Sequence, residues 1–271
     1  SYLNFSIPLF GENSLNYFVR NIDNLLIGKL LGGAILGYYS KAYSLMLLPV
    51  RQISGSIANV MFPSFSIIKN DKPKVWMGYM NVVKIVSFVN FPLMISLYFF
   101  ATEIVLLLLG SQWLEVIPMI KALCFLGSIQ SIGTLAGSIY NSQGKTGLQF
   151  KVGLFSKLIM STGIVYGLLK GGVLDMIFYY TITSILMFFV ELYFVTKILN
   201  NSIIDFVVEL KSELLVIVVY LVSMILLFSI VNTDGLVNKI LIQLASVTIF
   251  LFLSMKLELF AFQLVKKYLK K

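Results

Sequence analysis

Eight apolar stretches, each of roughly 20 residues, follow one another along this chain and are separated only by short polar connections. In lipid, every backbone polar group needs a partner inside the protein, which an isolated helix provides for itself. The pattern therefore predicts an all-α membrane protein of about eight transmembrane helices. Prolines at 49 and 92 predict bends, and residues 103–109 predict a short extension after the third span. The expected spans are residues 14–31, 35–60, 75–101, 116–140, 148–169, 174–195, 214–231 and 236–255.

Composition supports a membrane protein and excludes several kinds of chemistry. Hydrophobic residues make up 58% of the chain and charged residues 12%, whereas soluble domains are about 25% charged. Histidine is absent and Cys124 is the single cysteine, which excludes His-based catalysis, His-ligated metals and an intrachain disulfide. No phosphate loop, nucleotide fingerprint or metal-ligand cluster is present. We therefore expect no cofactor, no metal and no enzymatic activity.

The basic residues predict an orientation in the bilayer. The net charge of +9 comes mostly from loops and the tail, so it indicates membrane topology rather than binding to nucleic acid. Alternate connections are lysine-rich, and the positive-inside rule places these connections and the C-terminus in the cytoplasm. Residues 256–271 are expected to form a basic amphipathic helix on the membrane surface. The lysines of the rich set are Lys69, Lys72, Lys74, Lys145, Lys151, Lys197, Lys211, Lys256, Lys266, Lys267, Lys270 and Lys271.

Polar side chains share one face of the first expected span. At about 100° per residue, Arg20, Asp23 and Asn24 lie on the same side of a helix. Two interpretations remain open for this face. It either lines a hydrophilic substrate cavity, or Arg20 and Asp23 form an ion pair three residues apart while the asparagines bond to neighbouring helices.

The next two spans repeat this pattern. In the second span, Lys41, Ser44, Gln52 and Asn59 share a side of an ideal helix, and in the third span Asn81 and Lys84 lie about one turn apart. Charged groups inside a membrane usually face the bundle interior or a wet cavity. These residues are therefore candidates for a polar transport path.

Other polar and aromatic residues give weaker signals. Lys121 and Lys157 are expected to snorkel to the interface, and Arg51, just past Pro49, fits either an interfacial or an interior position. Glu191 is a lone acid in the sixth span, suited either to ion coupling or to a hydrogen bond between helices. Trp76 and Trp113 are expected in the aromatic belts. Pairs of glycines four residues apart, such as Gly163 and Gly167, indicate close helix packing.

Three groups of residues carry a resemblance to a known family. The strings NIDNLLIGKLLG (21–32), LGYYSKAYSLMLLP (36–49) and VMFPSFS (60–66) are similar to polysaccharide flippases of the multidrug/oligosaccharidyl-lipid/polysaccharide exporter superfamily. They resemble most the branch that exports O-antigen and colanic-acid-type lipopolysaccharide. GSQW (110–113), Pro118 and QGK (143–145) continue the resemblance. It covers roughly the first 145 residues, and beyond them only the hydropathy pattern agrees.

The resemblance implies a fold and a domain scheme. Members of the superfamily have two six-helix lobes around a central cavity that opens alternately to each side. On this scheme residues 1–13 are a linker or interfacial segment, 14–200 the second (C-terminal) six-helix lobe of a MATE-like transporter, 201–255 two extra helices and 256–271 the tail. The chain begins at Ser1, without an initiator Met or signal peptide, so a fragment with a missing N-terminal lobe is expected. That lobe of the same protein would then be a partner.

The resemblance also implies a function. Family members flip undecaprenyl-pyrophosphate-linked oligosaccharides across the bacterial cytoplasmic (inner) membrane for surface polysaccharide biosynthesis, with membrane lipid and other assembly proteins as partners. Arg20, Lys41 and Lys84 would attract the diphosphate, and Asn24 and Asn81 would bond sugar hydroxyls. Asp23 and Glu191 are the expected ion-coupling groups, because energy is expected to come from an ion gradient or the membrane potential.

Three alternatives are weighed against this function. A drug or small-cation exporter of the same superfamily would need a cavity dominated by carboxylates, which Arg20, Lys41 and Lys84 disfavour. An O-antigen polymerase or ligase would need a large outer loop, and no connection here is long enough. A truncated, non-transporting remnant is the third alternative, and the sequence upstream of Ser1 would decide it.

Overall fold

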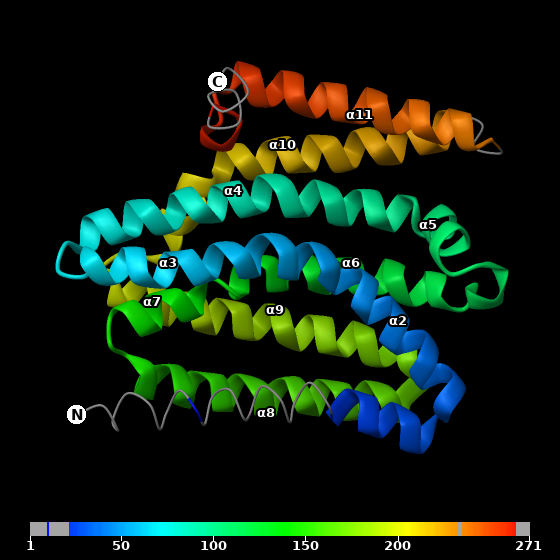
Figure 1. Ribbon diagram of the computed structural model, residues 1–271, viewed down its shortest axis with the longest axis horizontal. Helices are drawn as coiled ribbons and strands as arrows, with labels where there is room; N and C mark the ends of the chain where they lie inside the picture. The colour runs from blue at the N-terminus through cyan, green and yellow to red at the C-terminus, as the bar shows by residue number, and fades with distance from the viewer. Residues whose placement is uncertain (1–9, 11–21, 232–234, 264–271) are drawn as a thin grey trace.

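The chain folds into long helices that lie side by side. The structure is a computed structural model, which describes residue 10 and residues 22–231 and 235–263, and within these residues no strand occurs. Residues 22–30 are helical and lead into the series shown in Figure 1. The following elements are α2 (Gly33–Pro49), η1 (Val50–Gly55), α3 (Ser56–Ile67), α4 (Lys72–Phe99), α5 (Ala101–Leu108), η2 (Ser111–Trp113), α6 (Val116–Gly133), α7 (Ala136–Ser142), α8 (Thr146–Gly171), α9 (Val173–Ile198), α10 (Ile203–Ile230) and α11 (Leu236–Lys256).

The predicted fold class, an all-α membrane protein, is confirmed. Seven helical segments of the described residues are long and apolar enough to cross a membrane, and they correspond to the second to eighth predicted spans. The first predicted span, 14–31, lies largely outside the described residues, as does the tail from 264. The helix that contains the seventh predicted span, 214–231, starts at Ile203, because Ser202 and Asp205 form a capping box there.

The lysine-rich connections meet at one end of the bundle, as the charge pattern predicts. Lys72 Nζ donates to Asn200 Oδ1 at 3.2 Å, and Gln143 Nε2 donates to the Lys69 carbonyl at 3.3 Å. At this end Asp71 caps α4 by accepting from the Lys74 amide at 3.2 Å. Hydrogen bonds from Lys74, first from its side chain, also lower the pKa of Asp71.

The bend predicted at Pro49 takes the form of a π-helix. Pro49 ends α2 and cannot donate a backbone hydrogen bond, and η1 follows it directly with i→i+5 bonding. The chain then continues as α3, so that α2, η1 and α3 form one long broken helix (Figure 1). Asn90 of α4 supports the break, since its Nδ2 donates to the buried Ser54 Oγ at 2.9 Å.

Helices α8 and α9 approach each other closely through small residues. A Cβ atom placed on Gly163 would lie 2.7 Å from Thr183 Oγ1, and one on Gly167 would lie 2.6 Å from the Asp175 carbonyl oxygen. Only glycine fits these distances. The close packing predicted from the glycine spacing is therefore confirmed for this helix pair.

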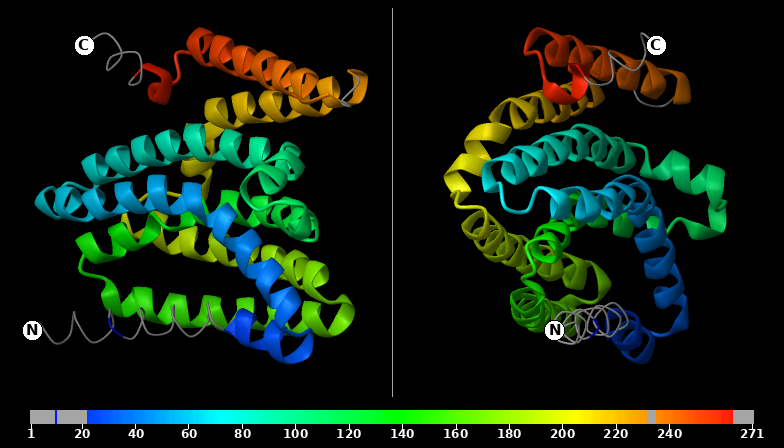
Figure 2. Two further views of the ribbon diagram at one scale, coloured as in Figure 1. Left: turned by 45° about the vertical axis from the view of Figure 1, so that its right-hand side comes forward. Right: turned by 60° about the vertical axis from the view of Figure 1, so that its left-hand side comes forward.

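Helices α10 and α11 form a hairpin at one edge of the bundle, at the opposite edge from α8 (Figures 1 and 2). A polar network fastens this hairpin to α4, in which Gln243 Nε2 donates to both Ser96 Oγ and Tyr220 OH, at 3.0 and 2.9 Å. At the end of the bundle near α5, Lys239 Nζ pairs with Glu103 Oε1 at 2.5 Å. An apolar cluster that includes Phe250 fills the space between the hairpin and α4.

Candidate functional site

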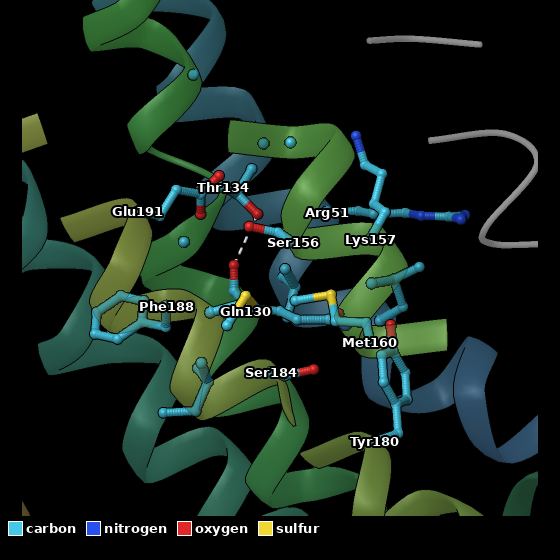
Figure 3. Close-up of a pocket in the computed structure, with 18 of the residues that line it drawn as sticks. Arg51, Gln130, Thr134, Ser156, Lys157, Met160, Tyr180, Ser184, Phe188 and Glu191 are labelled. Carbon is cyan, nitrogen blue, oxygen red and sulfur yellow. Dashed lines mark hydrogen bonds between the residues drawn. The ribbon is translucent and has the colours of Figure 1, made fainter. Parts of the chain in front are cut away.

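A large polar cavity lies on the side of the bundle away from the α10–α11 hairpin. Its volume is about 1090 Å³, and its walls come from residues 22–30, the α2–η1–α3 segment, α6, α7, α8 and α9. Figure 3 shows the part of the wall that η1, α6, α8 and α9 form. Hydrophilic side chains gather here although each contributing helix is mainly apolar, as expected for a path that lipid does not fill.

Four charged side chains line this cavity in the described part of the chain: Asp23, Arg51, Lys157 and Glu191. In Figure 3, Arg51 and Lys157 extend toward one side, whereas Glu191 lies beside Thr134 on the opposite side. Two cations and two anions give this described lining a formal charge of zero. The cavity therefore offers separate positive and negative regions rather than one strong field.

Neutral polar groups complete the lining, and several have unused hydrogen-bonding capacity. Gln149 Oε1, Ser156 Oγ and Ser184 Oγ are buried, and none of them has a hydrogen-bond partner among the described residues. Buried polar groups normally are bonded. Their presence on a cavity wall indicates a site suited to a hydrogen-bonding ligand or to water.

The carboxylate of Asp23 accepts two hydrogen bonds that hold it in place. Its Oδ2 accepts from Tyr39 OH at 2.7 Å and its Oδ1 accepts from the Asn24 amide at 2.7 Å. The side chain is buried. This contact joins the helix of residues 22–30 to α2 and fixes one corner of the cavity.

The structure brings together only some of the residues predicted from the sequence. Asp23, Asn24 and Glu191 line the cavity. Arg20 lies outside the described residues. Lys41 is exposed, and its ammonium group lies 5.9 Å from the Trp113 ring centroid, away from the cavity lining.

The two candidates on the third span, Asn81 and Lys84, also do not line the cavity. Both belong to α4, and none of the lining residues comes from that helix. Lys84 instead faces α10, where its Nζ lies 3.7 Å from Glu209 Oε2. Their predicted substrate contacts stay predictions without support from the cavity geometry.

The predicted face of the second span is split. Ser44 and Asn59 line the cavity, but Lys41 and Gln52 do not, although all four share a face of an ideal helix. Because η1 contains about one residue more per turn than an α-helix, Asn59 beyond it is rotated relative to α2, whereas Lys41 and Ser44 both precede it and keep their regular phase. Arg51 follows Ser44 by seven residues and lies on the side of Ser44 even on a regular helix.

Lys157 is the clearest cavity residue that the sequence interpretation placed elsewhere. It is buried, with 9% of its surface exposed, and it does not snorkel to an interface. The signal was present in the sequence, because Lys157 is the twelfth residue of a 26-residue helix. Either end of that helix is about 17 Å away or more, which exceeds the reach of a lysine side chain.

The comparisons with known proteins agree with the predicted resemblance. Residues 1–118 match a family described as polysaccharide biosynthesis protein. The lipopolysaccharide biosynthesis protein WzxC of Escherichia coli (strain K12) is 28% identical over 165 residues, which are 61% of this chain and 34% of WzxC. The teichuronic acid biosynthesis protein TuaB of Bacillus subtilis (strain 168) is 28% identical over 188 residues, 69% of this chain and 39% of TuaB.

The name of a third relative refers to transport. The succinoglycan biosynthesis transport protein ExoT of Rhizobium meliloti (strain 1021) is 22% identical over 171 residues, 63% of this chain and 35% of ExoT. The chain thus spans 34 to 39% of the length of these three curated relatives. No solved structure matches it. The resemblance predicted from the sequence is confirmed as a similarity to polysaccharide biosynthesis proteins.

Proposed function

We propose that the chain takes part in flipping lipid-linked oligosaccharide across the cytoplasmic membrane, a proposal that starts from the match of residues 1–118 to a family described as polysaccharide biosynthesis protein. The observation that carries the proposal is the polar cavity of about 1090 Å³ inside a bundle of apolar helices. A glycan head group on a pyrophosphate cannot cross hydrocarbon unaided, and it needs a hydrophilic path of this kind. The proposed carrier lipid is undecaprenyl pyrophosphate.

The cavity has groups suited to both parts of such a head group. Arg51 and Lys157 extend toward the same side and would bind the diphosphate through charge-assisted hydrogen bonds. Gln149, Ser156 and Ser184 present polar atoms that have no hydrogen-bond partner within the described part of the chain, and these atoms would bond sugar hydroxyls. Asp23 and Glu191 balance the formal charge, which would keep binding weak enough for release.

The proposed mechanism is alternating access, in which the cavity opens first to one side of the membrane and then to the other. Lipid tails would stay in the bilayer while the head group crosses. We propose residues 14–200 as a six-helix lobe and residues 201–255 as an added pair of helices, a division supported by the edge position of the α10–α11 hairpin. A second lobe would supply the opposite wall of the path.

One observation favours a second candidate, a drug or cation exporter. Asp23 and Glu191 both line the cavity, and carboxylates attract cationic ligands. The names of the relatives favour the polysaccharide substrate. Binding measurements with ligands of opposite charge separate the two candidates.

The experiment compares cavity variants with a matched lysine on the same helix. Arg51→Ala and Lys157→Ala in the purified chain, reconstituted in nanodiscs, should weaken binding of undecaprenyl pyrophosphate about 10- to 100-fold, because a charged hydrogen bond contributes about 1.5–3 kcal/mol. Lys151→Ala is the control, since Lys151 is exposed on α8 and outside the cavity lining.

The results distinguish the candidates. Parent-like affinity in both cavity variants would remove the diphosphate assignment. Binding of tetraphenylphosphonium that is lost in Glu191→Gln, with no binding of the lipid diphosphate, would favour the cation exporter. In cells, surface polysaccharide should fall in Arg51→Ala and Lys157→Ala at normal membrane abundance.

A further inference from the structure

A second group of ionisable side chains lies between α4 and α10, outside the cavity lining. Lys84 Nζ of α4 lies 3.7 Å from Glu209 Oε2 of α10, and the indole Nε1 of Trp76 donates to Glu209 Oε1 at 2.7 Å. Glu213 follows Glu209 by four residues, which places it on the same face of α10 one turn further along. Neither glutamate was singled out from the sequence, because the predicted span began at residue 214.

These groups lie deep in the helix pair. Lys84 is the thirteenth residue of α4 and Glu213 the eleventh of α10. At 1.5 Å per residue they are about 18 and 15 Å from the helix starts, so neither group belongs to a helix end.

The charges of this group do not balance. One lysine faces two glutamates, so the fully ionised set carries a formal charge of −1. Glu213 is buried at 4% exposure, whereas the side chains of Glu209 and Lys84 are 37% and 18% exposed. No hydrogen bond from another side chain to the Glu213 carboxyl group is recorded among the described residues. A buried carboxylate without a close cationic partner is unfavourable, and binding a proton removes its charge.

Glu213 has two charged neighbours, Lys84 on α4 and Glu209 on its own helix. Lys84 of α4 interacts electrostatically with Glu213. Tyr79, which is also on α4 and is buried, packs its ring against Phe206 of α10. On α10 itself, Glu209 lies one turn away and Lys211 is exposed. In the described parts of α9 and α11, no charged side chain is recorded in contact with Glu213, and Lys256 and Glu258 are exposed.

We propose that Glu213 is an exchangeable proton site between α4 and α10. In the protonated state Glu213 is a neutral carboxylic acid and Lys84 pairs with Glu209 alone. When the proton leaves to water, the Glu213 carboxylate competes for Lys84, and the contact of Lys84 with Glu209 weakens. Proton occupancy thereby changes the polar contacts that hold α10, and with it the α10–α11 hairpin, against α4.

This site differs from the predicted ion-coupling pair Asp23 and Glu191, which line the cavity. It does not rest on the proposed function, because it needs no glycan or lipid ligand. Its test can therefore fail or succeed independently of the transport experiments.

Trp76 is a built-in reporter for the test. The chain has two tryptophans, so Trp113→Phe leaves the indole bonded to Glu209 as the single emitter. The fluorescence of this protein in nanodiscs is titrated with pH, and we expect one reversible step. The step should disappear when Glu213→Gln is added, and persist with Glu209→Gln, in which the amide oxygen still accepts from Trp76. Glu115→Gln, an exposed carboxyl group, is the matched control and should titrate like the parent.

Infrared difference spectroscopy across the same pH range gives a second readout. Among the carboxylic-acid C=O bands that appear at the acidic end in the parent, one should be absent from Glu213→Gln. Absence of a fluorescence step in the parent, or a step retained in Glu213→Gln, would overturn the proposal. If both glutamine variants lose the step, the infrared band decides: its presence in Glu209→Gln supports Glu213, and its absence there refutes it.

Discussion

The close contact between α8 and α9 at Gly167 allows a quantitative prediction. A Cβ atom on Gly167 would lie 2.6 Å from both the Asp175 carbonyl oxygen and Met176 Cα, and 2.8 Å from Met176 N. All three are backbone atoms of α9, which cannot rotate away as a side chain can. Gly167→Ala must therefore push the two helices apart along their contact or distort the first turn of α9.

The expected loss follows from two opposing effects. Overpacking of a well-packed contact costs about 1–3 kcal/mol, and backbone neighbours place this case at the upper end. Alanine returns about 1 kcal/mol through its higher helix propensity. We therefore expect Gly167→Ala to lower the free energy of unfolding by about 2 kcal/mol, a fall in Tm of about 4–8 °C for a protein of this size.

The control lies on the same helix. A Cβ atom on Gly147 would meet nothing within 4 Å, so Gly147→Ala should be as stable as the parent or slightly more stable. Thermal unfolding of the purified proteins in detergent, followed by circular dichroism, measures the difference. Equal Tm values for Gly167→Ala and Gly147→Ala would refute the packing argument.

Three further predictions concern single polar contacts. Tyr39→Phe removes the hydrogen bond to Asp23 and should destabilise the protein by about 1–3 kcal/mol, seen as faster hydrogen exchange in residues 22–30; unchanged exchange would count against the contact. Glu103→Gln weakens the ion pair with Lys239, so α11 should exchange faster while α8 does not; equal rates in α11 would contradict this. The cap of α4 should depend on pH: because the pKa of Asp71 is lowered, its stabilising effect is complete above the ordinary value of 3.8 and is lost as the pH falls below it. Hydrogen exchange at the start of α4 should show this loss in the parent and not in Asp71→Asn, and identical profiles would refute it.

The membrane helices could be predicted from the sequence because hydrophobic length is a local property. A segment such as residues 236–255 must cross the bilayer wherever its neighbours lie, and α11 is found at Leu236–Lys256. The close approach at Gly163 and Gly167 was also predictable, since spacing alone brings small residues onto one face.

The cavity lining could be predicted only in part, because it depends on helix phase and on neighbours distant in sequence. Lys41 and Asn59 share a face only if the helix between them is regular, and the π-helix at Val50–Gly55 breaks that regularity. Trp76 was expected in an aromatic belt, but it is buried at 7% exposure against Glu209, which follows it by 133 residues. Hydropathy carries no information about such a partner.

The π-helix at η1 also has a consequence for how this wall of the cavity tolerates change. A π-turn is geometrically equivalent to one residue inserted into an α-helix, so deleting one residue within Val50–Gly55 would permit a continuous helix. Because the π-turn already absorbs that extra residue, α3 would keep its present orientation relative to α2, and Asn59 would stay on the wall that Ser44 occupies. The same deletion in a regular stretch of α2 would instead turn every residue beyond it by about 100°. The π-helix is thus the part of this cavity wall where the loss of one codon leaves the two halves of the helix facing the same partners.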